Sequence, residues 1–145
     1  MADDRCRKAK EYLQQVKLCD VNVTNKLEEL SRLKDMVYHI TSTLRGDVVS
    51  GSGNQDKLGD AVAKIVDLEA EINDAIDAYV DKKREISKTI EKITDPDQVQ
   101  VLHKRYFEYL TWEQIACEIP MSYRNVCYVH GRALQAVAEL IDPLG

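Results

Sequence analysis

Apolar residues recur every three or four positions through the first forty residues of the chain. They are Ala9, Leu13, Val16, Val23, Leu27, Leu30 and Val37. That spacing places them on one face of an α-helix, with Asp20 and Lys34 as polar interruptions of the same stripe. The pattern predicts one long amphipathic helix.

A similar repeat fills the chain from Leu58 to Ile93. Its members are Leu58, Val62, Ile65, Ile72, Ile76, Tyr79, Ile86, Ile90 and Ile93. Residues 45–56 separate the two repeats and hold Gly46, Gly51 and Gly53 among Ser, Asn and Asp, a composition that ends helices and reverses the chain. The two repeats therefore predict an antiparallel, coiled-coil-like hairpin over residues 1–94.

The hairpin is expected to form a homodimer. Each arm of about 36 residues would reach ~54 Å at ~1.5 Å per residue. Two such helices are too long and thin to bury their apolar stripes within one chain. We therefore expect a second copy to cover the apolar face that remains.

Residues 95–145 are predicted to form a separate all-helical domain. Asp95 precedes Pro96, and a proline disfavours helix in the residue before it while suiting the first turn of the next helix. The first helix of this domain is expected to pack through Val99, Leu102, Tyr106 and Leu110.

Two further helices are predicted after this one. Thr111 with Gln114 three residues later forms a capping-box pattern, which predicts a short helix over residues 112–119. Ser122 supplies a new N-cap for a longer helix over residues 123–141. A short helix, a tight turn and a longer helix are the helix-turn-helix pattern.

The internal spacing of this segment supports the helix-turn-helix interpretation. The positions that must be small or apolar are filled by Ile115, Ala116, Ile119, Met121, Val126 and Val129. Pro120 stands where such motifs commonly use a glycine with positive φ, which proline cannot adopt. We therefore expect a turn of different geometry. A plain three-helix packing core is the alternative interpretation of the same residues.

The exposed face of the last helix suits DNA. Arginine can present a bidentate fork to guanine, and asparagine can pair with adenine. Arg124, Asn125 and Tyr128 are accordingly assigned to base edges in the major groove. The residues assigned to phosphate contacts and positioning are Thr111, Ser122, Tyr123 and Arg132.

Composition and charge narrow the class of protein. Hydrophobic residues make up 44% of the 145 residues and charged residues 31%, which indicates a folded, helix-rich protein. The net charge of −5 argues against a protein that coats nucleic acid non-specifically, although residues 122–135 hold two arginines, a histidine and no acid. A charged start and the lack of an apolar run of ~20 residues predict a cytoplasmic protein without membrane contact.

Metal, cofactor and catalytic sites are not expected. Cys127 and His130 lie three residues apart, but two ligands at one spacing do not define a tetrahedral zinc site, and the cysteines are interpreted as reduced structural residues. Gly51, Ser52 and Gly53 lack the spacing of a phosphate-binding loop. The histidines have no nucleophile or carboxylate arrangement beside them, so the sequence predicts no enzyme.

The stretch Val101–Val137 resembles region four of bacterial sigma factors. It reads VLHKRYFEYLTWEQIACEIPMSYRNVCYVHGRALQAV, with the Leu-x-x-Arg-Tyr-Phe-x-x-x-Thr-x-x-x-Ile-Ala run of that region and a final Arg-Ala-Leu. The whole chain is similar to a phage and prophage family of Gram-positive bacteria, close to late-transcription regulators of the autolysin-regulatory-protein type. The resemblance implies a regulator of phage genes that acts with host RNA polymerase.

Two other functions stay open at this point. Phage DNA-packaging proteins, such as small terminase-like recognition subunits, also join a helix-turn-helix to an oligomerising coiled coil. Alternatively, the sigma-like module is an adaptor that contacts RNA polymerase through the face bearing Lys104 and Arg105 and has little DNA affinity.

Overall fold

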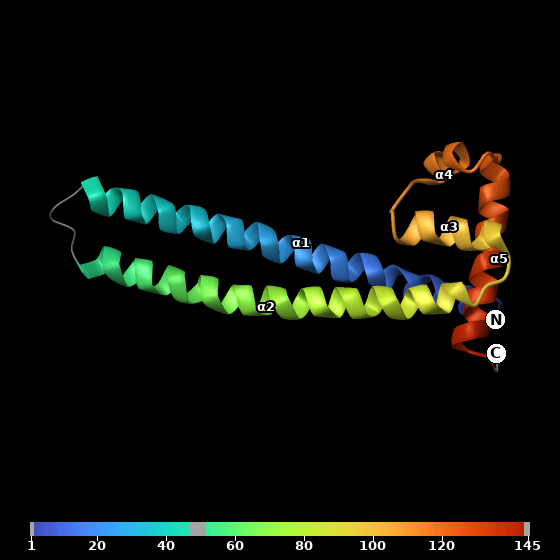
Figure 1. Ribbon diagram of the computed structural model, residues 1–145, viewed down its shortest axis with the longest axis horizontal. Coiled ribbons are helices and arrows are strands. Elements are labelled where there is room, and N and C mark those ends of the chain that lie inside the picture. The colour runs from blue at the N-terminus through green and yellow to red at the C-terminus, as the bar shows by residue number, and fades with distance from the viewer. Residues whose placement is uncertain (1, 47–51, 144–145) are drawn as a thin grey trace. The chain divides into compact units, whose positions relative to one another are not determined.

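All regular structure in the described residues is helical. The computed structural model describes residues 2–46 and 52–143. Its helices, drawn in Figure 1, are α1 (Ala2–Gly46), α2 (Ser52–Glu91), α3 (Pro96–Tyr106), α4 (Trp112–Glu118) and α5 (Tyr123–Ile141). The predicted all-α class is confirmed. None of these helices contains a segment long and apolar enough to cross a membrane.

The chain divides into two compact units. The terminal unit comprises Met1–Cys19 and Val80–Gly145, and the middle unit comprises Asp20–Tyr79. The domain boundary predicted between residues 94 and 95 coincides with the loop between α2 and α3. The compact units instead divide α1 and α2 themselves, so that the start of α1 and the end of α2 belong with α3, α4 and α5.

The start of α1 is part of the core of the terminal unit. Ala9, Leu13 and Val16 are fully buried, and Ile86 and Ile90 of α2 are buried in the same unit. Helix propensity alone leaves such side chains in water, so their burial reflects packing against other helices of the unit. The apolar stripe that the sequence shows here is therefore a packing face.

Polar contacts join the same elements at their ends. The Tyr12 hydroxyl of α1 lies 2.9 Å from the Thr89 hydroxyl of α2. Arg5 donates through Nη2 to the carbonyl of Asp142 at 2.9 Å, and its Nη1 lies 3.5 Å from a carboxylate oxygen of Glu139. The cation satisfies a carbonyl at the C-terminus of α5, where positive charge is favourable.

The middle unit buries much less apolar surface. Among the side chains that the structure describes, its buried ones are Ala61, Leu68, Ile72 and Ala75, all from α2. The described side chains of α1 in this unit are half-buried or exposed. The Lys26 ammonium lies 3.4 Å from the Glu71 carboxylate, which sets the two helices side by side here (Figure 1).

Two expectations for the hairpin are corrected. Leu27, Val62 and Ile76 were predicted on the apolar stripes but are exposed. In α2 the reason is that the small alanines at 61 and 75 let the helix pack on a neighbouring face. The linker predicted at 45–56 is also shorter, since α1 continues to Gly46 and α2 begins at Ser52. Gly51 lies outside the described residues.

Local capping signals set the ends of α3, α4 and α5. Pro96 lies in the first turn of α3, as predicted, and the Asp95 side chain adds an N-cap by accepting from the amides of Asp97 and Gln98. Thr111 and Gln114 form the predicted capping box at α4, and the Ser122 hydroxyl caps α5. Each cap satisfies amides that the first turn of a helix leaves without partners. The three helices pack against one another pairwise (Figure 1).

The segment between α3 and α4 departs from the expected helix. Leu110 was predicted on the packing face of α3, but α3 ends at Tyr106. Tyr109 has φ 60°, the left-handed region, and is the one such non-glycine residue in the described part of the chain. The Leu110 amide then bonds to the Lys104 carbonyl at 3.0 Å. Leu110 still packs against the core, from the loop rather than from the helix.

Candidate nucleic-acid interface

The connection between α4 and α5 is a tight turn without positive φ. Ile119 ends α4 in an extended conformation, with φ −100° and ψ 114°. The Met121 amide bonds to the Ile119 carbonyl, which closes a three-residue turn centred on Pro120. Proline suits this position because its fixed φ is negative. The expectation of a turn unlike the glycine type is confirmed.

The predicted core residues of α4 and α5 are brought together. Val101, Ile115, Ile119 and Val126 form a buried cluster. The half-buried residues packed against it are Leu110, Trp112, Ala116, Met121 and Val129. Every position that the sequence predicted as small or apolar takes part, and Val101 is an additional member. The cluster fixes α5 on α4 and decides which face of α5 meets solvent.

α5 has one buried face and one exposed polar face. Its buried residues are Val126, His130, Ala133, Leu134, Val137 and Ala138. Arg124, Asn125 and Tyr128 are exposed, Tyr128 by 61%. Together with Ser122 they line a shallow surface depression. The three residues assigned to base edges therefore share one solvent-facing surface. Together with Ser122, Tyr123 and Arg132 they form what we call the α5 face.

Two residues assigned to phosphates are occupied as helix caps. The Ser122 hydroxyl accepts from the Asn125 amide at 3.1 Å, and the Thr111 hydroxyl accepts from the Gln114 amide at 3.2 Å. A hydroxyl that accepts keeps its own proton for donation. Both residues are exposed, so each is able to cap its helix and to donate to an anion in solvent.

Tyr123 and Tyr128 are the aromatic residues of the α5 face. Arg132 donates through Nη1 to the Tyr128 hydroxyl at 3.2 Å, one turn away on the same helix. Tyr123 is half exposed. The nearby Cys127 side chain first, then partial burial and the charge of Glu113, raise the pKa of the Tyr123 phenol. The phenol therefore stays protonated at neutral pH and is a donor.

Behind the α5 face lies a buried aromatic and polar cluster that the sequence did not reveal. The Tyr106 hydroxyl lies 2.7 Å from His130 Nε2, and the His130 ring lies 4.4 Å from the Trp112 ring. Burial first, then the charges of Lys10 and Arg105, lower the pKa of His130 to about 4. Burial raises the pKa of Tyr106 to about 12. The histidine is neutral and the phenol protonated near pH 7.

Arg105 contacts the start of α4 and the loop before it. Its guanidinium stacks 4.1 Å from the Trp112 ring centroid, and Nη1 donates to the Leu110 carbonyl at 2.9 Å. A stacked, hydrogen-bonded guanidinium holds one orientation better than a lysine would. Periodicity gave no sign of this role, because both partners lie beyond the end of α3.

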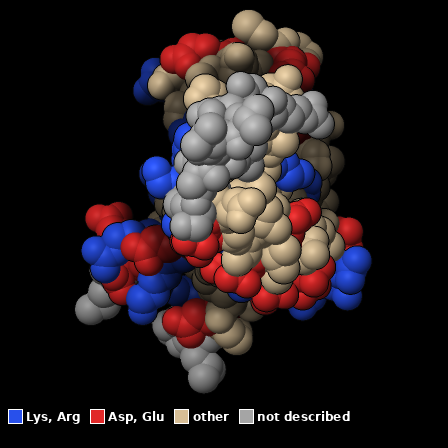
Figure 2. All heavy atoms as spheres, turned by 90° about the vertical axis from the view of Figure 1, so that its left-hand side faces the viewer, with Lys and Arg blue, Asp and Glu red and all other residues tan. Residues whose placement is uncertain are grey.

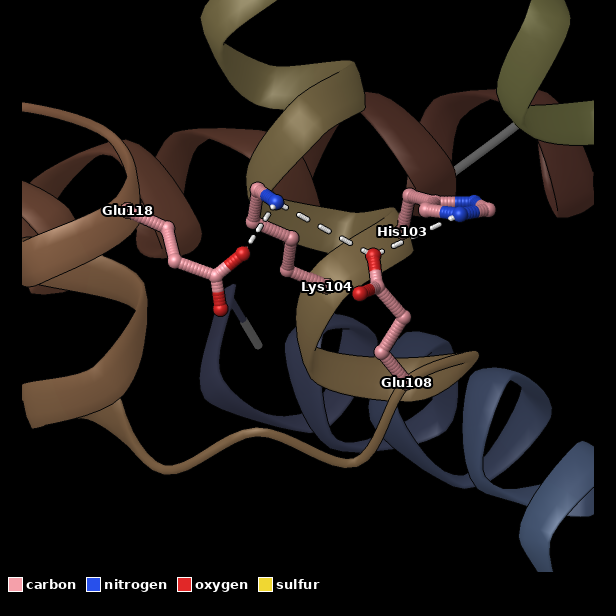
Figure 3. A network of polar contacts seen from close by, with 4 residues as sticks. All are labelled: His103, Lys104, Glu108 and Glu118. Carbon is pink, nitrogen blue, oxygen red and sulfur yellow. Dashed lines mark hydrogen bonds and ion pairs between the residues drawn. The ribbon is translucent and has the colours of Figure 1, made fainter.

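Lys104 is paired with two carboxylates within the terminal unit. Figure 3 shows its ammonium between two carboxylates, 3.0 Å from Glu118 of α4 and 4.0 Å from Glu108. The hydrogen bond to Glu118 is the first reason that the pKa of Lys104 is raised. His103 lies 3.6 Å from the same Glu108 carboxylate. This network joins α3 to α4 and holds the Lys104 ammonium against two carboxylates of the same unit.

The charged side chains form no broad basic surface on the face that Figure 2 shows. Acidic and basic residues are interspersed there, in accord with the net charge of −5. Within residues 2–46 and 52–143, His, Cys, Asp and Glu side chains make no cluster of three or more suited to a metal ion.

These residues define an all-helical protein in which α5 packs one face against an apolar core and exposes a polar face to solvent. The chain belongs to the family described as a protein of unknown function, DUF1492, which matches residues 39–140. The match includes α3, α4 and the whole α5 face. Comparison with curated proteins and with solved structures gave no match.

Proposed function

We propose that the protein binds duplex DNA sequence-specifically and regulates transcription, with α4 and α5 as a helix-turn-helix and α5 as the reading helix. The observation that carries the proposal is the division of α5 into a buried apolar face and an exposed face with Arg124, Asn125 and Tyr128. An arginine and an asparagine at the start of a helix are the side chains that read guanine and adenine in the major groove.

The positions of the caps add support. Ser122 and Thr111 lie at the N-termini of α5 and α4, where free amides and hydroxyls suit phosphate oxygens. Arg132 and Tyr123 flank the reading residues on the same helix and are assigned to the backbone of the duplex. The resemblance of Val101–Val137 to sigma region four favours a regulator of phage or prophage genes.

A homodimer formed through the middle unit is part of this proposal. The contacts Tyr12 to Thr89 and Lys26 to Glu71 occur in the order that an antiparallel hairpin predicts. Large apolar side chains that stay exposed in the described part of the middle unit are Val21, Leu27, Met36, Tyr38, Val62, Val66 and Ile76. A second copy of the same unit would cover them, and two reading helices would bind two half-sites.

The test is a binding selection from random duplex DNA at near-physiological salt with the full chain. We expect one enriched site, and Arg124→Ala and Asn125→Ala each to weaken binding to it by about 1–3 kcal/mol, the worth of one good base contact. Arg84→Ala is the matched control, because it removes an exposed positive charge from α2 and no base contact.

The outcome that would sink the proposal is a folded protein that enriches no sequence. Equal losses for Arg124→Ala and Arg84→Ala would reduce the interaction to general electrostatics. Unchanged helical circular dichroism in the variants separates either result from misfolding.

The two alternatives have less support. An adaptor that binds RNA polymerase through Lys104 and Arg105 would need the Lys104 ammonium, which is already paired with Glu118 and Glu108. A DNA-packaging subunit shares the helix-turn-helix but assembles into rings, so ring-sized oligomers in solution would favour it over a dimeric regulator.

A further inference from the structure

A small cavity lies in the terminal unit between the start of α1, the end of α3 and the segment after α3. Its volume is about 110 Å³, and it is lined by Gln14, Lys17, Arg105, Tyr106 and Tyr109. Drug-sized ligands need roughly 300 Å³ or more. The cavity therefore suits a group of the size of phosphate or a small carboxylate.

The wall of this cavity offers hydrogen-bond donors and positive charge. Lys17 and Arg105 bring two cations, Gln14 brings an amide, and no carboxylate lines it. The Lys17 ammonium lies 5.8 Å from the Tyr109 ring centroid. Arg105 uses Nη1 for the Leu110 carbonyl, which orients the rest of its donor fork. This donor set matches an oxyanion.

Tyr109 gives the cavity a strained wall. Its φ of 60° is unfavourable for an aromatic residue and is held by the bond from the Leu110 amide to the Lys104 carbonyl. Backbone in such regions persists where the surroundings over-determine it, and it gathers at ligand sites. A glycine would make the same turn without strain, whereas Tyr109 adds an aromatic ring beside Lys17.

We propose that this cavity binds a phosphate-sized oxyanion, supplied by a phosphate of the DNA backbone or by free phosphate. Arg105 connects the cavity to the candidate interface, because it stacks on Trp112 at the start of α4 and its charge acts on Tyr123 at the start of α5. The site thus adds α1, a distant part of the sequence, to the anion-binding surface. The DNA source rests on the proposed function, whereas the free-phosphate source does not.

The first experiment titrates sodium phosphate into the full chain at constant ionic strength. Trp112 is the sole tryptophan of the sequence and touches Arg105, so its fluorescence reports occupancy, with equilibrium dialysis of radiolabelled phosphate as the direct readout. We expect saturable binding that weakens at least tenfold in Lys17→Gln and is unchanged in Lys34→Gln. Both lysines are exposed on α1, and Lys34 lies far from the cavity in sequence.

Absence of saturable phosphate binding in both readouts overturns the proposal, as does equal binding by the wild type and Lys17→Gln. The second experiment measures the salt dependence of DNA affinity. If a backbone phosphate fills the cavity, Lys17→Gln lowers the slope of log K against log salt by about one. An unchanged slope assigns the site to free phosphate. A wild type without DNA affinity refutes the proposed function and leaves the phosphate titration standing.

Discussion

The buried pair of Tyr106 and His130 links the packing of the terminal unit to pH. His130 is 9% exposed and its Nε2 lies 2.7 Å from the Tyr106 hydroxyl. Lys10 and Arg105 are the charged groups that act on it. Burial and both of these charges disfavour the protonated, positively charged form of His130. The native state therefore holds His130 in its neutral form.

This pair predicts a loss of stability in mild acid. The pKa of His130 falls from 6.5 to about 4 on folding, so between these values the unfolded chain binds more protons than the native state. The free energy of unfolding that depends on neutral His130 is fully present above pH 6.5 and is lost as the pH falls toward 4. It amounts to about 3 kcal/mol. Denaturant unfolding at a series of pH values measures it.

His130→Gln is the informative variant for this prediction. A glutamine carbonyl can still accept from the Tyr106 hydroxyl but does not titrate, so the slope between pH 4 and 6.5 should shrink. His39→Gln removes an exposed histidine of α1 and should keep the slope of the wild type. The same slope in all three proteins would show that His130 is not the group responsible.

At the scale of helices, the start of α1 packs in the same compact unit as α3, α4 and α5. Leu13 is fully buried, whereas Leu18, five residues later on the same helix, is 68% exposed. Leu13→Ala should lower the free energy of unfolding by about 2–5 kcal/mol, because it leaves a cavity among α1 and its neighbours. Leu18→Ala should change it by less than about 0.5 kcal/mol.

Trp112 fluorescence is the readout for both leucine variants. It reports on the packing of α3, α4 and α5, because its ring contacts Arg105 and His130. A lower free energy of unfolding for Leu13→Ala, measured by Trp112 fluorescence, would show that the start of α1 stabilises the candidate interface. Equal stability of the two variants would mean that residues 95–145 fold without α1.

Local signals in the sequence predicted the elements that local forces decide. The caps at Thr111 and Ser122, and with them the starts of α4 and α5, follow from side chains within three residues of each helix start. The apolar core of α4 and α5 followed from spacing alone. The solvent-facing position of Arg124 then results from the helical period.

Other features depend on contacts that no local pattern encodes. Periodicity identified the stripe of Ala9, Leu13 and Val16 but not that it belongs to one compact unit with residues 80–145. Tyr109 takes a backbone conformation usually left to glycine, so no turn signal marks it. Arg105 looked like a solvent-exposed helix charge, yet it is fixed by Leu110 and Trp112 beyond the helix end.

At the scale of the whole molecule, the exposed apolar residues of α2 predict self-association. Val62, Val66 and Ile76 are spaced by four and ten residues, which sets them on one side of the helix. Val66 is 60% exposed, so a lysine there is tolerated by the monomer but places a charge in the dimer contact. Val66→Lys should raise the dimer dissociation constant at least tenfold, equivalent to about 1.4 kcal/mol.

Sedimentation equilibrium over a range of protein concentrations tests this expectation. Ala78→Lys is the control, because residue 78 is exposed on a different side of α2 and adds the same charge. A wild type that stays monomeric at every concentration excludes the dimer.

Since two half-sites require two reading helices, Val66→Lys should also weaken binding to a palindromic site more than binding to a single half-site. Equal effects on the two DNAs would separate dimer formation from DNA recognition.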